Sequence, residues 1–98
     1  MDDRTTAQET IRLRLFGLRG AGKSRIEKEV YPFAANLTVS DVWEGLKRQA
    51  EPGSVLATLS NDKVLALVNG TPIQRLAEWE STLEAGDTIT FMAKAFGG

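Results

Sequence analysis

The sequence of 98 residues contains no cysteine and no histidine. Without cysteine the chain has no disulfide framework, no thiolate nucleophile and no cysteine-ligated zinc. Without histidine it also lacks the commonest general base and the commonest metal ligand, so we expect no metal site. Any chemistry in which this protein takes part must therefore use a less common reactive group.

Long hydrophobic runs are missing as well. The longest uninterrupted apolar stretch is residues 64–68, whereas a membrane span needs about 20 residues. The polar start, MDDRTTAQET, has no apolar stretch that could act as a signal peptide. We therefore expect a cytoplasmic protein that does not bind membranes.

The length and composition are sufficient for one domain with one modest core, since 42 % of the residues are hydrophobic and 26 % are charged. Residues 1–9 are polar and show no periodicity, so they are predicted to form a flexible N-terminal segment. Residues 10–98 are then predicted to form a single domain that ends in a glycine tail.

Alternating apolar and polar side chains predict a hairpin in the first third of the chain. In residues 10–16, Ile11, Leu13 and Leu15 share one face. A second alternating stretch, residues 25–33, follows a glycine-containing segment. The two strands are therefore expected to pair through this loop.

Two further strands are predicted in the second half of the chain. Residues 64–68 are all apolar and are expected to form a strand that is buried on both faces. Residues 88–93 alternate, which places Ile89 and Phe91 in the core and Met92 on the opposite face. Met92 is therefore a candidate for contact with a partner.

One three-turn helix is predicted between these pairs of strands. Thr38 is the expected N-cap, because Asp41 three residues later completes a capping box. Apolar residues at spacings of three and four form one stripe, which consists of Val39, Val42, Leu46 and Ala50. Trp43 lies off this stripe and is expected to be partly exposed, where it either covers the margin of the core or docks a partner. Trp79, in an irregular segment, is open to the same two interpretations.

The predicted order is strand, strand, helix, strand, strand. One helix of this length is best buried against one face of a sheet, and a right-handed crossover through it would separate the second and third strands. We therefore predict an α+β fold of the ubiquitin-like β-grasp type, with a four- to five-stranded mixed sheet packed on one main helix.

Residues 17–24 match the phosphate-loop pattern GxxxxGK[ST] in full. In a nucleotide-binding fold Lys23 would contact the outer phosphates and Ser24 would bind magnesium. Such a loop needs an apolar strand before it and a helix after it, but the preceding strand carries Arg12 and Arg14 and the following segment alternates. We therefore interpret residues 17–24 as a flexible hairpin loop, with phosphate binding as the alternative.

Basic residues crowd the same hairpin. The net charge of −1 and the absence of interleaved aromatic residues argue against a nucleic-acid partner. We interpret the basic side chains as a solvated strand face that keeps a sheet edge from pairing wrongly. Residues 10–28 contain one acid, Glu27, against Arg12, Arg14, Arg19, Lys23, Arg25 and Lys28.

The sequence ends in Gly97 and Gly98, a few residues after the predicted last strand. Because glycine has no Cβ, such a tail can pass through a narrow channel and lie extended against another protein's backbone. The reactive group that this arrangement predicts is the carboxylate of Gly98.

Several segments, in this order, resemble the β-grasp sulfur carriers of the MoaD/ThiS family. These carriers have a helix that opens with Thr-Val, an apolar strand that ends near Val-Asn, a Leu-x-x-Gly-Asp-x-(Ile/Val)-x-Phe segment and a final Gly-Gly. The matching residues here are Thr38-Val39, Leu67-Val68-Asn69, Leu83 with Gly86, Asp87, Ile89 and Phe91, and Gly97-Gly98. The length and the linker after the helix are more similar to MoaD, the small subunit of molybdopterin synthase, whereas the bulky Phe96 before Gly-Gly is more typical of ThiS-like tails.

The resemblance implies a carrier rather than an enzyme, with no cofactor bound. An adenylating enzyme related to the ubiquitin-activating enzymes would use ATP to convert the Gly98 carboxylate to an acyl-adenylate. A sulfur donor would then give a thiocarboxylate, which a synthase large subunit or an equivalent sulfur acceptor consumes, in molybdopterin biosynthesis for a MoaD-like protein. The residues expected to bind these partners are Gly97, Phe96, Ala95, Lys94 and Met92.

Other functions remain open at this point. ThiS-like carriers serve other pathways, and a ubiquitin-like modifier would be conjugated to target lysines through the same Gly98 carboxylate. A nucleotide-binding module built on residues 17–24 and a purely structural partner domain are two further alternatives.

Overall fold

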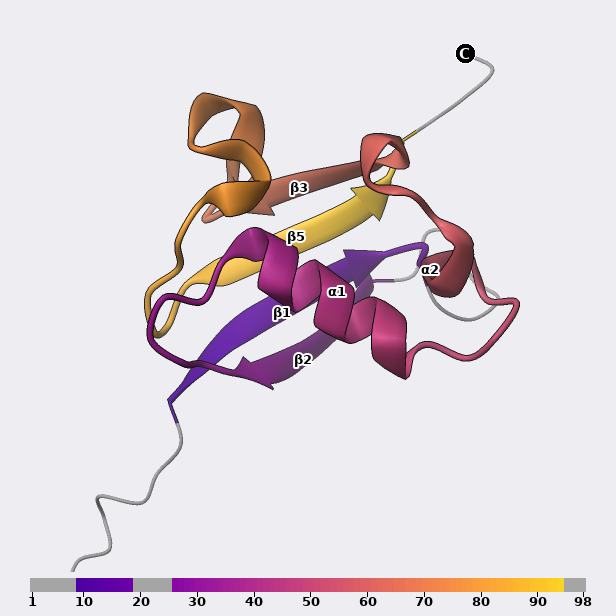
Figure 1. Cartoon of the computed structure of the whole chain (residues 1–98), viewed down its shortest axis with the longest axis horizontal. Helices are drawn as coiled ribbons and strands as arrows, with labels where there is room; N and C mark the ends of the chain where they lie inside the picture. Colours follow the sequence, from indigo (N-terminus) through magenta and orange to yellow (C-terminus); the bar gives the residue numbers. More distant parts are fainter. Residues whose placement is uncertain (1–8, 19–25, 95–98) are drawn as a thin grey trace, which may run out of the picture.

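Five strands form one mixed sheet in the part of the chain that the computed structural model describes, residues 9–18 and 26–94 (Figure 1). Their spatial order is β2-β1-β5-β3-β4. The strands are β1 (Thr10–Phe16), β2 (Ile26–Pro32), β3 (Val64–Val68), β4 (Thr71–Pro72) and β5 (Thr88–Ala93).

The connections follow the predicted crossover. β1 pairs antiparallel with β2 and parallel with β5, and β5 pairs antiparallel with β3. Helix α1 (Val39–Gln49) connects β2 to β3 along the chain. In the sheet these two strands are not neighbours, because β1 and β5 lie between them. The prediction of an α+β fold with a mixed sheet packed on one main helix is confirmed.

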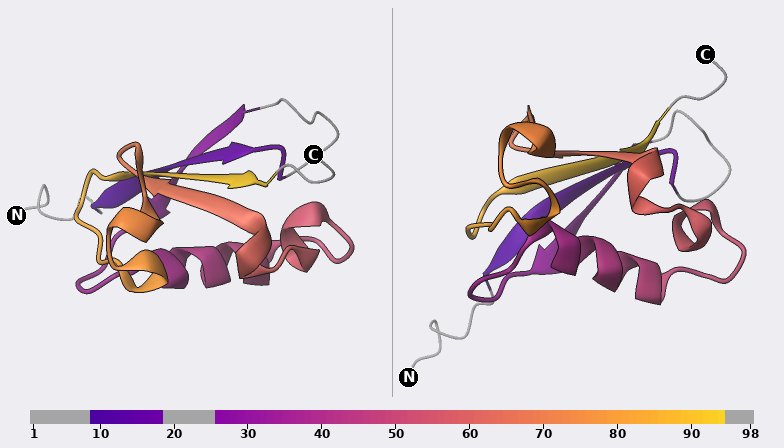
Figure 2. Two further views of the ribbon diagram at one scale, coloured as in Figure 1. Left: turned by 90° about the horizontal axis from the view of Figure 1, so that it is seen from above. Right: turned by 45° about the horizontal axis from the view of Figure 1, so that its top comes forward.

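The helices of the described residues lie on one face of the sheet, and the opposite face, here called the outer face, carries none of them (Figure 2). Besides α1 there is a one-turn helix, α2 (Val55–Thr58). Short 3-10 helices cover Asn61–Lys63, Ile73–Arg75 and Glu78–Glu80. None of the helices seen in residues 9–18 and 26–94 is long and apolar enough to cross a membrane.

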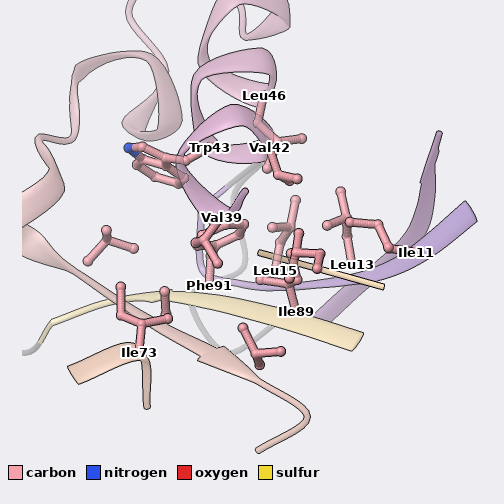
Figure 3. Close-up of a cluster of buried hydrophobic side chains, with 14 of the residues drawn as sticks. Ile11, Leu13, Leu15, Val39, Val42, Trp43, Leu46, Ile73, Ile89 and Phe91 are labelled. Carbon is pink, nitrogen blue, oxygen red and sulfur yellow. The ribbon is translucent and has the colours of Figure 1, made fainter. Parts of the chain in front are cut away.

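The core lies between α1 and the inward face of the sheet (Figure 3). As the alternation predicts, the inward side chains of β1 and β5 are buried. They are Ile11, Leu13, Leu15, Ile89 and Phe91, and they meet Val39, Val42, Trp43 and Leu46 from α1.

The predicted capping box of α1 is confirmed. The backbone N–H of Asp41 donates to Thr38 Oγ1 (3.1 Å), and the backbone N–H of Thr38 donates to Asp41 Oδ2 (3.0 Å). These bonds satisfy donors that the helix itself leaves without a partner, so the first turn is fixed by its own sequence.

The expectation that Trp43 is partly exposed is wrong, because its side chain is fully buried. Its indole Nε1 donates to Asn61 Oδ1 (2.8 Å), and its ring centroid lies 5.0 Å from that of Phe91. Trp43 follows Val39 by four residues and precedes Leu46 by three, so it extends the apolar stripe rather than flanking it.

The expectation that β3 is buried on both faces is also wrong. Val64, Ala66 and Val68 are buried, but Leu65 is 37 % exposed and Leu67 is only partly buried. Since helices cover one face of the sheet, the outward side chains of β3 have no layer to pack against.

The first hairpin forms as predicted, and its basic face covers both an interior and an edge strand. β1 lies between β2 and β5, so Arg12 and Arg14 project from an interior strand and protect no edge, whereas Lys28 lies on β2, which is an edge strand. Of the phosphate-loop match, residues 19–24 lie outside the described residues. In a phosphate-loop fold a helix follows the Lys-Ser pair, here Lys23-Ser24. Because strand β2 begins at Ile26 instead, the structure favours the hairpin interpretation.

Replacing Gly45 with alanine should destabilise the protein, although alanine favours a helix over glycine by about 1 kcal/mol. A Cβ at Gly45 would lie 3.2 Å from Tyr31 Cζ and closer still to its hydroxyl oxygen. Overpacking of this kind costs about 1–3 kcal/mol, so we expect urea denaturation to show a net loss of about 1 kcal/mol.

The matched control is Tyr31→Phe, which removes the closest atom. In that background Gly45→Ala should cost less, because the ring no longer carries the hydroxyl that approaches the helix. Equal losses in both backgrounds would contradict this contact.

Candidate functional site

The candidate site is the end of β5, where the chain leaves the sheet. Met92 pairs with Phe16 of β1 on one side and with Leu65 of β3 on the other. One residue past the strand, the backbone N–H of Lys94 donates to the carbonyl oxygen of Lys63 (3.0 Å). The backbone is therefore fixed by its neighbours as far as Lys94.

Only part of the predicted site falls within the described residues. Met92 and Lys94 are described, whereas Ala95, Phe96, Gly97 and Gly98 lie outside. The sequence places four residues beyond Lys94, and the last two are glycines.

Met92 lies on the outer face, as the alternation predicts, and its side chain is half-buried. Its cross-strand partners Phe16 and Leu65 lie on the same face, so the three form a continuous apolar row across β1, β5 and β3. This apolar row, Phe16-Met92-Leu65, adjoins the point where the tail begins.

Aromatic rings support the strand from the core side. Phe91, the residue before Met92, is fully buried against Trp43, and its ring stacks on Trp79 with centroids 6.4 Å apart. Trp43 in turn is bonded to Asn61, which lies just before β3. The base of the tail is thus tied to both α1 and β3, which makes it a rigid mount.

The charges near this mount are those of Asp62, Lys63 and Lys94. The Ser60 hydroxyl donates to Asp62 Oδ1 (2.6 Å), and this bond lowers the pKa of Asp62 below its ordinary value of 3.8. The backbone N–H of Asp62 itself adds to the lowering, and the positive charges of Lys63 and Lys94 contribute less. Asp62 therefore stays ionised as the acidic partner beside two lysines.

Leu65 was not singled out by the sequence, because its five-residue apolar strand suggested burial on both faces. The signal that could have found it is the predicted layer count: a single helix covers one face of a sheet, so every second residue of β3 must face outward.

Solved structures similar to this chain include two solution structures. The solution structure of the Haloferax volcanii HVO 2177 protein matches with a TM-score of 0.62 and 21 % identity, covering 100 % of this chain and 94 % of that one. The small archaeal modifier protein 1 of Methanosarcina acetivorans matches with a TM-score of 0.60 and 22 % identity, covering 94 % of this chain and 99 % of that one. The fold is the ubiquitin-like β-grasp. No protein-family model and no curated protein matches the sequence.

Replacing Ser60 with alanine should raise the pKa of Asp62 toward its ordinary value, because it removes the largest cause of the lowering. Because the pKa of Asp62 is lower in the folded state, its ionised carboxylate stabilises the fold. This stabilisation is complete above the unfolded pKa and is lost as the pH falls through the folded pKa, so Ser60→Ala should reduce it. An NMR titration of the Asp62 side chain at acidic pH measures the change directly.

Ser40→Ala, a serine change on the first turn of α1, is the control and should leave the pKa of Asp62 in place. If Ser60→Ala also leaves the pKa of Asp62 unchanged, the Ser60 hydroxyl is not the cause of the lowered pKa.

Proposed function

We propose that this protein is a sulfur carrier whose Gly98 carboxylate is activated and converted to a thiocarboxylate by other enzymes. The observation that carries the proposal is the short glycine-ended tail behind a rigid mount. The sheet fixes the backbone to Lys94, and four residues separate that point from the end of Gly98. The MoaD-like role in molybdopterin biosynthesis, in the cytoplasm, is the specific form that the sequence resemblance favours.

The length of the tail limits where a partner must bind. Four extended residues span about 14 Å, so the active centre that receives the carboxylate must come that close to Lys94. A partner at that distance also meets the apolar row Phe16-Met92-Leu65, which is exposed enough to offer a hydrophobic contact. We therefore assign Met92 and its row, with Lys94, Ala95, Phe96 and Gly97, to partner binding.

The chemistry needs no acid or base from this chain. A Gly98 carboxylate oxygen attacks the α-phosphorus of ATP in the activating enzyme, which forms the acyl-adenylate and releases pyrophosphate. Sulfur from a donor then attacks the acyl carbon and AMP leaves, so that one carboxyl oxygen is exchanged for sulfur. The partners supply the catalytic groups, and this chain supplies the acyl group on an arm without Cβ atoms at its tip.

A ubiquitin-like modifier is the second candidate function. It is supported by the fold, since one of the similar structures is of a protein named a small archaeal modifier. Both functions begin with adenylation of Gly98, and they differ in the acceptor of the acyl group: sulfur in the carrier, a lysine amine in the modifier.

Intact-mass spectrometry after co-expression with the organism's adenylating enzyme and sulfur donor separates these functions. The protein should gain the mass of one oxygen-to-sulfur exchange, and deletion of Gly98 should abolish the gain because the reactive carboxylate is displaced. Deletion of Thr5, which removes a residue far from the tail in sequence, is the control and should leave the gain intact.

Conjugates of higher mass that vanish on deletion of Gly98, without any sulfur-containing form, would identify the modifier instead. An unchanged mass and no conjugates in the presence of active enzyme would count against both functions.

A further inference from the structure

The outer face has a second feature, away from the tail. A shallow hollow of about 610 Å³ lies over β1, β2 and the start of β5. Its outward side chains come from Arg12, Arg14, Lys28, Val30 and Thr88. The hollow begins beside the apolar row, where the Arg14 guanidinium lies 5.7 Å from the centroid of the Phe16 ring. It extends to Thr88, which precedes Met92 by four residues, about 13 Å along β5.

The cations in this hollow add little to the stability of the fold, because the contact of Arg14 with the Phe16 ring is a cation–π contact at an exposed site, where such contacts are weak. Arg14 and Lys28 occupy directly opposite positions on antiparallel strands, where like charges destabilise the pair. Within residues 9–18 and 26–94 no ion pair to Arg12, Arg14 or Lys28 is seen. Glu29 also borders the hollow, but its strand partner is Leu13, so its side chain leaves the sheet on the helix side.

The hollow combines these cations with an exposed aliphatic side chain. Val30, opposite Arg12, is 64 % exposed. Single-stranded nucleic acid is held by aromatic platforms together with cations, and the exposed apolar group here is aliphatic. The combination of guanidinium, ammonium and aliphatic groups fits a protein segment that carries carboxylates and an apolar residue.

We propose that this hollow binds an extended acidic segment of a partner protein, which goes beyond the carrier function of the tail. Arg12 and Arg14 are two residues apart on one face, which spaces them about 7 Å along the strand. An extended segment presents carboxylates at every second residue with the same spacing, so each carboxylate can meet one guanidinium. Lys28 adds a third cation beside Arg14, and Val30, which lies beside Arg12, offers an apolar contact to a side chain of the segment.

The probe is the synthetic peptide Ser-Val-Ser-Glu-Ser-Glu-Ser-Val-Ser, titrated to millimolar concentration into the isotope-labelled full chain and followed by amide NMR shifts. We expect saturable shifts at residues of β1, β2 and the start of β5, weakened by added salt. The same peptide with glutamine in place of glutamate should bind at least tenfold more weakly, because the charge-assisted bonds are lost.

The test variant is R12E/R14E, with R12Q/R14Q as a milder form in case charge reversal disturbs folding. Both should weaken peptide binding at least tenfold. The control, R48E/R75E, makes the same change in net charge at two exposed arginines outside the hollow and should leave binding within about twofold of the unaltered protein.

Three outcomes would overturn the proposal: no saturable shifts, equal weakening in the control variant, or tighter binding of single-stranded oligouridylate than of the peptide at the same residues. The intact-mass experiment on Gly98 is independent of all three. If the protein gains sulfur but does not bind the peptide, the carrier function stands and the binding role of the hollow is wrong. If it binds the peptide but gains no sulfur, the binding role stands and the carrier function is wrong.

Discussion

The pairing of β5 on both of its sides is the constraint on which the rest of the molecule depends. Because β1 and β3 hold this strand in register, Ile89 and Phe91 point toward α1 while Met92 points away. One strand thus supplies the centre of the core and the middle of the outer face. One residue past this strand, the backbone N–H of Lys94 donates to the carbonyl oxygen of Lys63, so the C-terminal segment starts from a backbone held in place rather than from a frayed edge.

A second consequence follows from the placement of all described helices on one face. Inward side chains meet a packed layer, whereas outward ones meet solvent or a partner (Figure 2). This is why Leu65 and Val30, which lie on the outer face, stay exposed. Exposed apolar groups that share a face with cations are typical of binding surfaces rather than of strands that serve only the core.

Local signals in the sequence predicted local structure well. Period-two alternation located β1 and β5, and the spacing of Thr38 and Asp41 predicted the start of α1. The spacing of Trp43 to Val39 and Leu46 is compatible with burial, but the contacts that cover its ring and bind its indole N–H come from Phe91 and Asn61, which lie far along the chain. The candidate site divides similarly. Alternation placed Met92 on the outer face, but its neighbours across the sheet follow from the register of non-local strands, which no local pattern specifies.

The outer face therefore carries two neighbouring features. The apolar row lies at the end where the tail begins, and the basic hollow begins beside it at Arg14 and extends to Thr88, about 13 Å from Met92 along β5. Although the net charge is −1, three cations gather on the outer face at Arg12, Arg14 and Lys28. Their electric field attracts an acidic partner to this face and orients the partner before contact. Orientation matters because a tail of about 14 Å reaches an active centre only from a narrow range of docked positions. Under the proposed function, the hollow orients the partner and the Gly98 carboxylate reacts, so docking and chemistry depend on different residues.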